Sequence, residues 1–324
     1  MTQFRWPLLL VLSLVIAGNA VSADAPLTRI QTIALKGVDG KLDHLAVDAK
    51  GERLFVANKP NNTLDVIDLK TGTLVRQIAE QGKVSGVAYA ADLNMVYVGN
   101  GSGVCNGFSC DDYKLVFSTK APGADNVHYH SGNKQVYVAH GQSLTILDGK
   151  TGEIKGDIKL PGSIHGFKID KKAEKVFAVL TKPAALAIID LAKNAVIETY
   201  PMTLSDAGSP IAFDAANQLL FVGCPKKPMV VVFDAKTGKE MTSIEIPAGI
   251  DDIQFDSKLN RIYCSCGESA LVVIEKKGEK YEVISKLETP KSSRTCAWSK
   301  GKLYLGVPKQ EGKEGPEIWV YEAR

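Results

Sequence analysis

A repeated unit of about 40 residues limits the folds open to this chain more than any other feature. Its first copy, KLDHLAVDAKGERLFVANKP at residues 41–60, has the pattern of a strand, a turn and a second strand. Six further copies begin with KVSGVAYA (83–90), GADNVHYH (123–130), SIHGFKID (163–170), AGSPIAFD (207–214), GIDDIQFD (249–256) and SSRTCAWS (292–299). Their spacing of 40 to 44 residues is the length of a four-stranded β-propeller blade.

The later strands of each unit follow the same plan. Third strands are predicted at TLDVID (63–68), SLTILD (143–148), ALAIID (185–190), MVVVFD (229–234) and ALVVIE (270–275). In three units an aspartate then leads into a K-T-G turn that ends at Gly72, Gly152 or Gly238. Aspartate bonds its own downstream backbone and glycine adopts positive φ, so this is the chemistry of a tight turn. The second unit is irregular, and its third and fourth strands are predicted near residues 104–110 and 113–120.

The two ends of the chain complement each other. The last unit has a third strand at residues 318–323 and no fourth, whereas RIQTIALKG at residues 29–37 is a strand without a unit. An N-terminal strand that completes the last blade removes two open sheet edges. The sequence therefore predicts an all-β fold, a seven-bladed β-propeller of four-stranded blades closed by this strand. It forms one domain over residues 24–324.

Residues 1–23 have the pattern of a secretory signal peptide, with Arg5, an apolar run at 8–17 and small residues before Asp24. The run is about ten residues long where a membrane span needs roughly 20, so we expect a cleaved signal and no stable membrane insertion. The mature protein is then periplasmic or secreted. A net charge of +3 without a Lys/Arg cluster argues against a nucleic-acid partner. We expect a monomer.

The chain has six cysteines. Cys105 and Cys110 are predicted to form a disulfide, because they lie close together beside a turn and an exported chain meets an oxidising compartment. Cys264 and Cys296, in apolar positions of neighbouring blades, are a second candidate pair. The alternative is that these cysteines are small, buried core residues.

Polar residues gather where the inner strands begin, and in a propeller these points meet at one mouth of the central channel. The set comprises Asp43, His44, Ser85, Asp125, Asn126, His165, Ser209, Asp251, Asp252, Arg294 and Thr295. An apolar residue follows in each strand. This order is typical of a solvated funnel above a packed ring, which is where a propeller would bind a ligand.

Three roles remain open for the mouth. Asp43, Asp125, Asn126 and Asp251 offer oxygen ligands for one divalent cation, calcium or, with the histidines, zinc. As a ligand site, the mouth would use Asp43, Asp125, Asn126, Asp251, Asp252 and Arg294, with His140 from a neighbouring loop. Alternatively, the aspartates only bond the backbone of the next blade, or the mouth docks another exported protein. His128 and His130 are a further candidate chelate with no fixed third ligand.

The strands RLFVANK, MVYVGNG and QVYVAHG resemble the YVTN-type β-propeller repeat family, as do D-H-L-A-V-D (43–48), A-D-N-V (124–127) and R-T (294–295). The resemblance covers nearly all of the mature chain and implies an exported bacterial propeller, but it implies little about function. His165-Gly166 departs from the histidine-proline-glutamate usual in the fourth blade. The funnel is also similar in plan to propeller lactonases and streptogramin lyases, which hold a central divalent cation.

Two functions follow. The first is an exported propeller that binds a small ligand, a metal or a protein partner at its mouth without catalysis. The second is a divalent-metal-dependent hydrolase or lyase of lactone-like small molecules. In that enzyme the cation would polarise a carbonyl, His44 or His165 would act as general base, and Arg294 would bind a substrate anion. The sequence has no G-x-S-x-G, H-E-x-x-H or P-loop motif that would favour another enzyme class.

Overall fold

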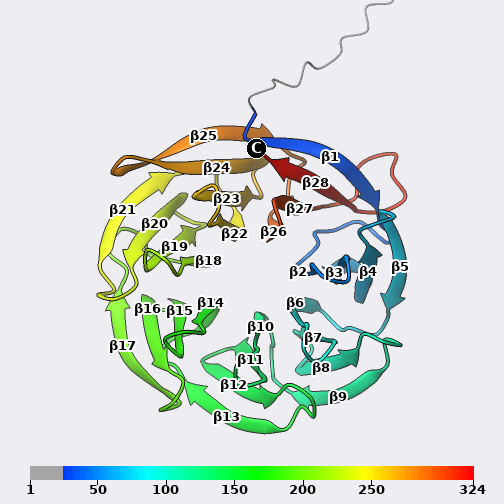
Figure 1. Ribbon diagram of the computed structural model, residues 1–324, viewed down its shortest axis with the longest axis horizontal. Helices are drawn as coiled ribbons and strands as arrows, with labels where there is room; N and C mark the ends of the chain where they lie inside the picture. The colour runs from blue at the N-terminus through cyan, green and yellow to red at the C-terminus, as the bar shows by residue number, and fades with distance from the viewer. Residues whose placement is uncertain (1–24) are drawn as a thin grey trace, which may run out of the picture.

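The computed structural model describes residues 25–324, which form a ring of seven antiparallel four-stranded blades (Figure 1). The all-β seven-bladed propeller predicted from the repeats is confirmed. The predicted signal peptide, residues 1–23, lies outside the described residues. Within them, no helix is both long and apolar enough to span a membrane.

The first four blades follow each other along the chain, with the innermost strand first. Blade 1 comprises β2 (Leu45–Asp48), β3 (Arg53–Asn58), β4 (Thr63–Asp68) and β5 (Thr73–Ile78), and a 3-10 turn, η1 (Lys59–Asn61), follows β3. Blade 2 comprises β6 (Val84–Ala90), β7 (Met95–Asn100), β8 (Val104–Ser109) and β9 (Leu115–Lys120). Blade 3 comprises β10 (Val127–His130), β11 (Gln135–His140), β12 (Ser143–Asp148) and β13 (Ile154–Lys159). Blade 4 comprises β14 (Ile164–Asp170), β15 (Lys175–Thr181), β16 (Ala184–Asp190) and β17 (Ala195–Pro201).

The remaining three blades close the ring. Blade 5 comprises β18 (Ile211–Asp214), β19 (Leu219–Cys224), β20 (Met229–Asp234) and β21 (Glu240–Glu245). Blade 6 comprises β22 (Ile250–Asp256), β23 (Arg261–Cys266), β24 (Ala270–Lys277) and β25 (Lys280–Glu288). Blade 7 comprises β26 (Thr295–Ser299), β27 (Lys302–Val307) and β28 (Glu317–Ala323), and β1 (Leu27–Ala34) is its fourth strand.

The first strand of the chain joins the two ends of the ring. It runs antiparallel to β28, with Leu27 opposite Ala323 and Ala34 opposite Glu317. Figure 1 shows β1 along the outside of β28, next to the C-terminus. The N-terminal strand therefore completes the last blade, as the sequence predicted.

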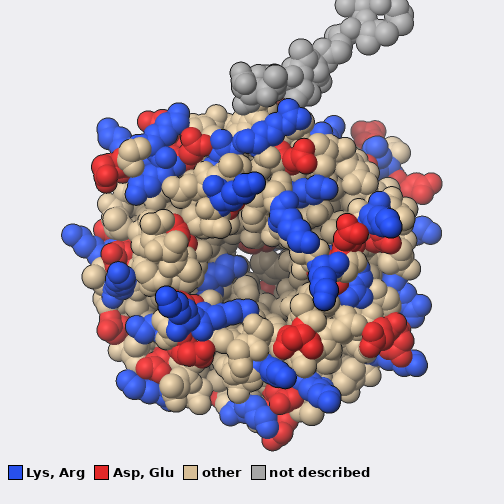
Figure 2. All heavy atoms as spheres, in the orientation of Figure 1, with Lys and Arg blue, Asp and Glu red and all other residues tan. Residues whose placement is uncertain are grey.

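The hydrophobic core is divided among the junctions between blades. Each of the seven apolar clusters draws its side chains from two neighbouring blades, such as Tyr137 and Phe167 at the junction of blades 3 and 4. This follows from strand geometry, because alternate residues of a strand point to opposite faces of its sheet and each face meets a different neighbour. The core leaves the ring axis free, and Figure 2 shows the resulting opening at the centre of one face.

The aspartate turns form as predicted. Asp68 Oδ1 accepts hydrogen bonds from the backbone N–H groups of Lys70 and Thr71 at 2.8 and 2.9 Å. Gly72 then adopts a φ of +69°, which a side chain would strain. The turns after Asp148 and Asp234 repeat this arrangement.

The predicted disulfide between Cys105 and Cys110 is not formed, since all six cysteines are buried free thiols. Cys105 is the second residue of β8 and Cys110 directly follows the end of that strand, five positions later. Alternation along a strand directs such residues to opposite faces, and the two side chains lie in different apolar clusters. Cys264 and Cys296 likewise belong to separate clusters. The cysteines are therefore small core residues, which was the alternative interpretation.

Candidate ligand-binding site

Irregular backbone at the starts of the inner strands places the polar residues at the mouth. In blade 4 the register shifts between Ile164 and Phe167, so that His165 and Gly166 together face one residue of β15. Blades 2 and 6 have the same kind of shift. Such bulges redirect a side chain without ending the strand. They explain why a polar pair precedes the apolar part of these strands.

The first polar group centres on Asp43. Lys59 Nζ donates a 2.6 Å hydrogen bond to Asp43 Oδ2. Ser85 Oγ lies 3.1 Å from the same oxygen and 2.5 Å from Asp125 Oδ1, so one hydroxyl connects two carboxylates of different blades. Burial alone would raise the pKa of Asp43, but the His44 and Lys59 charges outweigh it and lower this pKa. Asp43 is thus an ionised group held between blades 1 and 2.

The second polar group is an ion pair inside the channel. His44 Nδ1 lies 3.3 Å from Asp252 Oδ2, and the same oxygen accepts a hydrogen bond from the Cys296 backbone N–H at 3.2 Å. Burial lowers the pKa of His44, but the hydrogen bond to Asp252 and the nearby carboxylate charges raise it to about 10. A group with this pKa carries its proton at neutral pH. The structure therefore does not support the predicted role of His44 as a general base.

The third polar group borders the mouth between blades 4 and 7. Arg294 Nε lies 2.9 Å from Asp251 Oδ2, although its N–H does not aim at that oxygen, so the contact is an ion pair rather than a hydrogen bond. His165 Nδ1 lies 3.1 Å from Ser209 Oγ. Burial is the main influence on Asp251 and raises the pKa of its carboxyl despite the Arg294 charge.

A cavity of about 300 Å³ opens between the loops of blades 4 to 7, next to this third group. Its lining residues are mostly polar or charged: His165, Thr181, Lys182, Ser209, Lys226, Asp251 and Arg294, with Ala207, Gly208, Pro225, Gly249 and Ile250 between them. Three of these side chains are cationic and one is acidic. The cavity is therefore an electropositive recess whose walls come from four blades.

The channel below the mouth is narrower, and it holds two residues that were not predicted from the sequence, Lys168 and Gln254, together with His128, which was predicted only as a possible chelate with His130. Lys168 and His128 line both of its small cavities, the larger of about 70 Å³, and Gln254 lines the latter. Burial lowers the pKa of Lys168, and it lowers that of His128 well below the usual range with help from the Lys168 charge. Each of the three stands two positions after the second residue of the pair that begins its inner strand, which is Asn126, Gly166 or Asp252. The two-residue alternation of the inner strands was the signal that could have found them.

The four predicted metal ligands do not form one cluster. Asp43 and Asp125 share Ser85, whereas Asp251 pairs with Arg294. The side-chain amide nitrogen of Asn126 is buried without a hydrogen-bond partner among the described residues. Across residues 25–324, no three His, Cys, Asp or Glu side chains are grouped so that they could hold a metal ion.

His140 lies apart from the mouth cavity. Its Nε2 is 2.7 Å from Thr145 Oγ1, and that hydroxyl in turn donates to Asp157 Oδ1 at 2.9 Å. Burial lowers the pKa of His140. These contacts hold the His140 imidazole against the outer strands of blade 3.

Comparison with known proteins supports the fold alone. No protein-family model matches the chain, and no curated protein matches it either. Many solved structures do match, among them Kuenenia stuttgartiensis hydrazine synthase, with a TM-score of 0.73 and 14% sequence identity. The alignment covers 86% of this chain and 96% of that one. At this identity the similarity extends to the backbone architecture and carries no information about ligands or activity.

Proposed function

We propose that this protein is an exported propeller of the YVTN-type repeat family that binds a small anionic ligand at the mouth of its channel. The repeat motifs support the family, and the apolar segment near the N-terminus supports export. The ligand class is a carboxylate or a phosphate monoester of modest size. The observation that carries the proposal is the excess of cations in the mouth cavity.

Arg294 is the residue best placed to recognise an anion. Its Nε lies 2.9 Å from Asp251 Oδ2, and its guanidinium nitrogens form no hydrogen bond with any side chain or backbone group of residues 25–324. The side chain is 28% exposed. A guanidinium held in this way presents two parallel donors, which match the two oxygens of a carboxylate or phosphate. Asp251 and Arg294 line the same cavity, so their ion pair holds the guanidinium at the cavity wall.

Lys182 and Lys226 add charge without an acidic partner. Neither forms an ion pair within the described part of the chain, and both line the cavity. Thr181 and Ser209 add hydroxyl groups. A low-dielectric recess with converging cations attracts an anion more strongly than the same charges spread over an open surface.

The metal-dependent hydrolase predicted as the alternative would need a cluster of ligands that the described residues do not provide. Its two candidate bases also have different surroundings. His44 is protonated at neutral pH, and His165 lies at the edge of the anion cavity beside Ser209. Binding of an anion is therefore the function that we propose, with His165 as a neighbouring hydrogen-bonding group.

The test is titration calorimetry with inorganic phosphate and succinate on the wild type, Arg294→Ala, Lys226→Ala and Arg76→Ala. Arg76 is an exposed arginine on β5 and supplies the matched control. We expect Arg294→Ala to weaken binding about tenfold or more, since hydrogen bonds to charged groups contribute about 1.5–3 kcal/mol. The exposed Lys226→Ala should weaken it less, and Arg76→Ala should not change it. If the Arg294 and Lys226 variants both bind like Arg76→Ala, the mouth is not the anion site.

A further inference from the structure

Aromatic pairs fill most of the junctions between blades. In each pair, a ring from the second strand of one blade stacks on a ring from the inner strand of the next. The five pairs are Phe55–Tyr89, Tyr97–Tyr129, Phe177–Phe213, Phe221–Phe255 and Tyr263–Trp298, with ring centroids 4.7 to 5.8 Å apart. Stacked or tilted rings at these distances pack favourably and exclude water.

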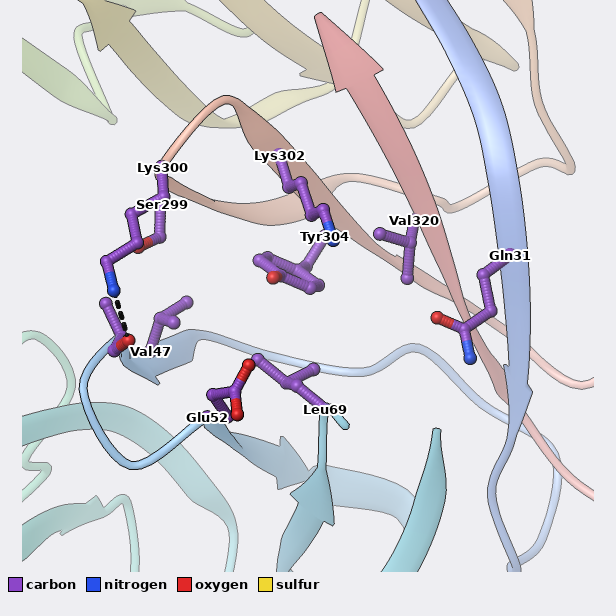
Figure 3. Close-up of a pocket in the computed structure, with 10 residues that line it drawn as sticks. Gln31, Val47, Glu52, Leu69, Ser299, Lys300, Lys302, Tyr304 and Val320 are labelled. Carbon is purple, nitrogen blue, oxygen red and sulfur yellow. Dashed lines mark hydrogen bonds between the residues drawn. The ribbon is translucent and has the colours of Figure 1, made fainter. Parts of the chain in front are cut away.

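The junction between blades 7 and 1 lacks the second ring. Tyr304 occupies the second-strand position, but the inner strand of blade 1 offers Val47 in place of an aromatic residue. A cavity of about 260 Å³ opens there, as Figure 3 shows, with Tyr304 at its centre. Val47, Leu69 and Val320 supply apolar walls. Lys300 Nζ bonds the Ala49 carbonyl at 2.6 Å and holds the two blades together along one side.

The next junction shows how this space is filled when a ring is present. Tyr89 stacks on Phe55 with 5.5 Å between ring centroids. Its hydroxyl donates to Asn94 Oδ1 at 3.2 Å and accepts from Arg53 Nη2 at 3.3 Å. The Tyr89 ring therefore stacks on another aromatic ring, and its hydroxyl bonds one acceptor and one cationic donor.

The residues around the empty position are equivalent to those that hold Tyr89. Glu52 corresponds to Asn94, since both end the turn after the inner strand with positive φ, 53° and 47°. Lys302 corresponds to Arg53, since each begins the second strand two residues before its ring. Neither Glu52 nor Lys302 forms an ion pair within residues 25–324. Burial and the Glu52 charge raise the pKa of Tyr304, which is consistent with a carboxylate close to the ring.

The remaining junction without a ring pair differs. Between blades 3 and 4, Ile169 packs where an aromatic residue would stand. The hydroxyl of Tyr137 is already bonded there, accepting from Asn133 Nδ2 at 2.8 Å and donating to Gln135 Oε1 at 2.9 Å. At the junction of blades 7 and 1, by contrast, the second ring is absent, and an acceptor, Glu52, and a cation, Lys302, stand around the empty position.

We propose that this junction pocket binds the phenol ring of a small molecule. The ring lies against Tyr304 where Tyr89 would lie against Phe55, its hydroxyl donates to the Glu52 carboxylate, and Lys302 donates to the hydroxyl oxygen. The pocket is at the far end of β2 from the mouth, because β2 starts just after Asp43 and ends just before Ala49. It is therefore separate from the anion site, and neither proposal depends on the other.

The experiment uses p-cresol, which has the ring, methyl and hydroxyl of a tyrosine side chain, and toluene, which lacks the hydroxyl. Binding to the full mature chain is followed by saturation-transfer NMR and a concentration series. We expect saturable binding of p-cresol, roughly millimolar or tighter for a ligand of this size, and at least about tenfold weaker binding of toluene. Equal binding of the two, or no saturable binding of p-cresol, would overturn the proposal.

Variants locate the site. Val47→Tyr should fill the pocket with its own phenol and abolish p-cresol binding, whereas Val75→Tyr, at a 53% exposed position of β5, should not. Glu52→Ala should weaken p-cresol binding about tenfold and leave toluene unchanged, and Glu52→Asn, which restores the acceptor of blade 2, should recover the hydroxyl preference. If Val47→Tyr fails to fold, the two Glu52 variants decide. Wild-type affinity in Glu52→Ala would refute the assignment.

Discussion

Raising the pH from 6.5 to 10 should destabilise this protein, because over this range His44 gives up its proton in the unfolded chain and keeps it in the folded one. In the folded chain His44 Nδ1 lies 3.3 Å from Asp252 Oδ2, and its Nε2 lies 3.8 Å from Asp43 Oδ1. Burial disfavours the imidazolium, but these two carboxylates and Asp125 favour it more and raise the pKa from 6.5 to about 10. The proton therefore stays on the ring over a range in which an unfolded histidine would lose it.

The sign and size of the effect follow from linkage. The folded pKa is above the unfolded one, so the stabilisation is fully present below pH 6.5 and is lost as the pH rises through 10. Each unit of pKa difference corresponds to about 1.4 kcal/mol, so the free energy of unfolding falls by at most about 5 kcal/mol across this interval. The slope approaches about 1.4 kcal/mol per pH unit between the two values.

Other channel groups also titrate, so the comparison must isolate His44. Burial lowers the pKa of Lys168, and a lysine with a lowered folded pKa makes stability rise with pH, which offsets part of the histidine effect. The variant His44→Gln keeps Lys168 and every other titrating group. The difference between the pH slopes of the wild type and this variant therefore reports His44 itself.

The assay is urea unfolding followed by tryptophan fluorescence at pH 6.5, 8 and 9.5, together with an NMR titration of the wild-type imidazole. We expect the free energy of unfolding of the wild type to fall more steeply with pH than that of His44→Gln. The imidazole resonance should titrate near pH 10. Parallel slopes in the two proteins, or an imidazole that titrates near 6.5, would refute the ion-pair reasoning.

Two further predictions test the packing of the ring. A Cβ on Gly86 would lie 1.8 Å from the Asp125 backbone oxygen. Gly86→Ala should therefore lower the free energy of unfolding, measured in the same urea assay, by about 1–3 kcal/mol or more. Gly156→Ala is the control, because the nearest neighbour of its Cβ would be 3.5 Å away and the effect should be much smaller. Ellman's reagent should detect six thiols in the unfolded chain and react slowly with the native one, because all six are buried and free; four reactive thiols would show that a disulfide forms.

The blade pattern was predictable because its determinants are local. Strand alternation, the aspartate turns and the N-terminal strand that lacks a unit all act over a few residues or at the chain ends, and the structure contains each of them. The polar residues at the inner-strand starts were predictable for the same reason. Their position in the repeat directs them to one end of the ring.

The partners of those polar residues were not predictable. His44 meets Asp252 across 208 positions of sequence, and Ser85 connects two carboxylates 40 and 42 positions away. Which cation reaches which carboxylate depends on the bulges and on the spacing between blades. A set that resembled a metal site in sequence is therefore divided into separate ion pairs and hydrogen bonds.

Sequence alone determined the seven blades, their closure and the polar mouth, because each depends on periodicity and turn chemistry within one repeat. Tertiary structure decided the charge states and the cavities, because these depend on contacts between blades. The clearest case is Val47, an ordinary strand residue in its own repeat. Only the approach of Tyr304 from the other end of the chain shows that a ring is absent there. The repeat period and the turn residues act between neighbours in sequence. Which side chains pair and pack across blades depends instead on distances that are fixed only when the ring closes.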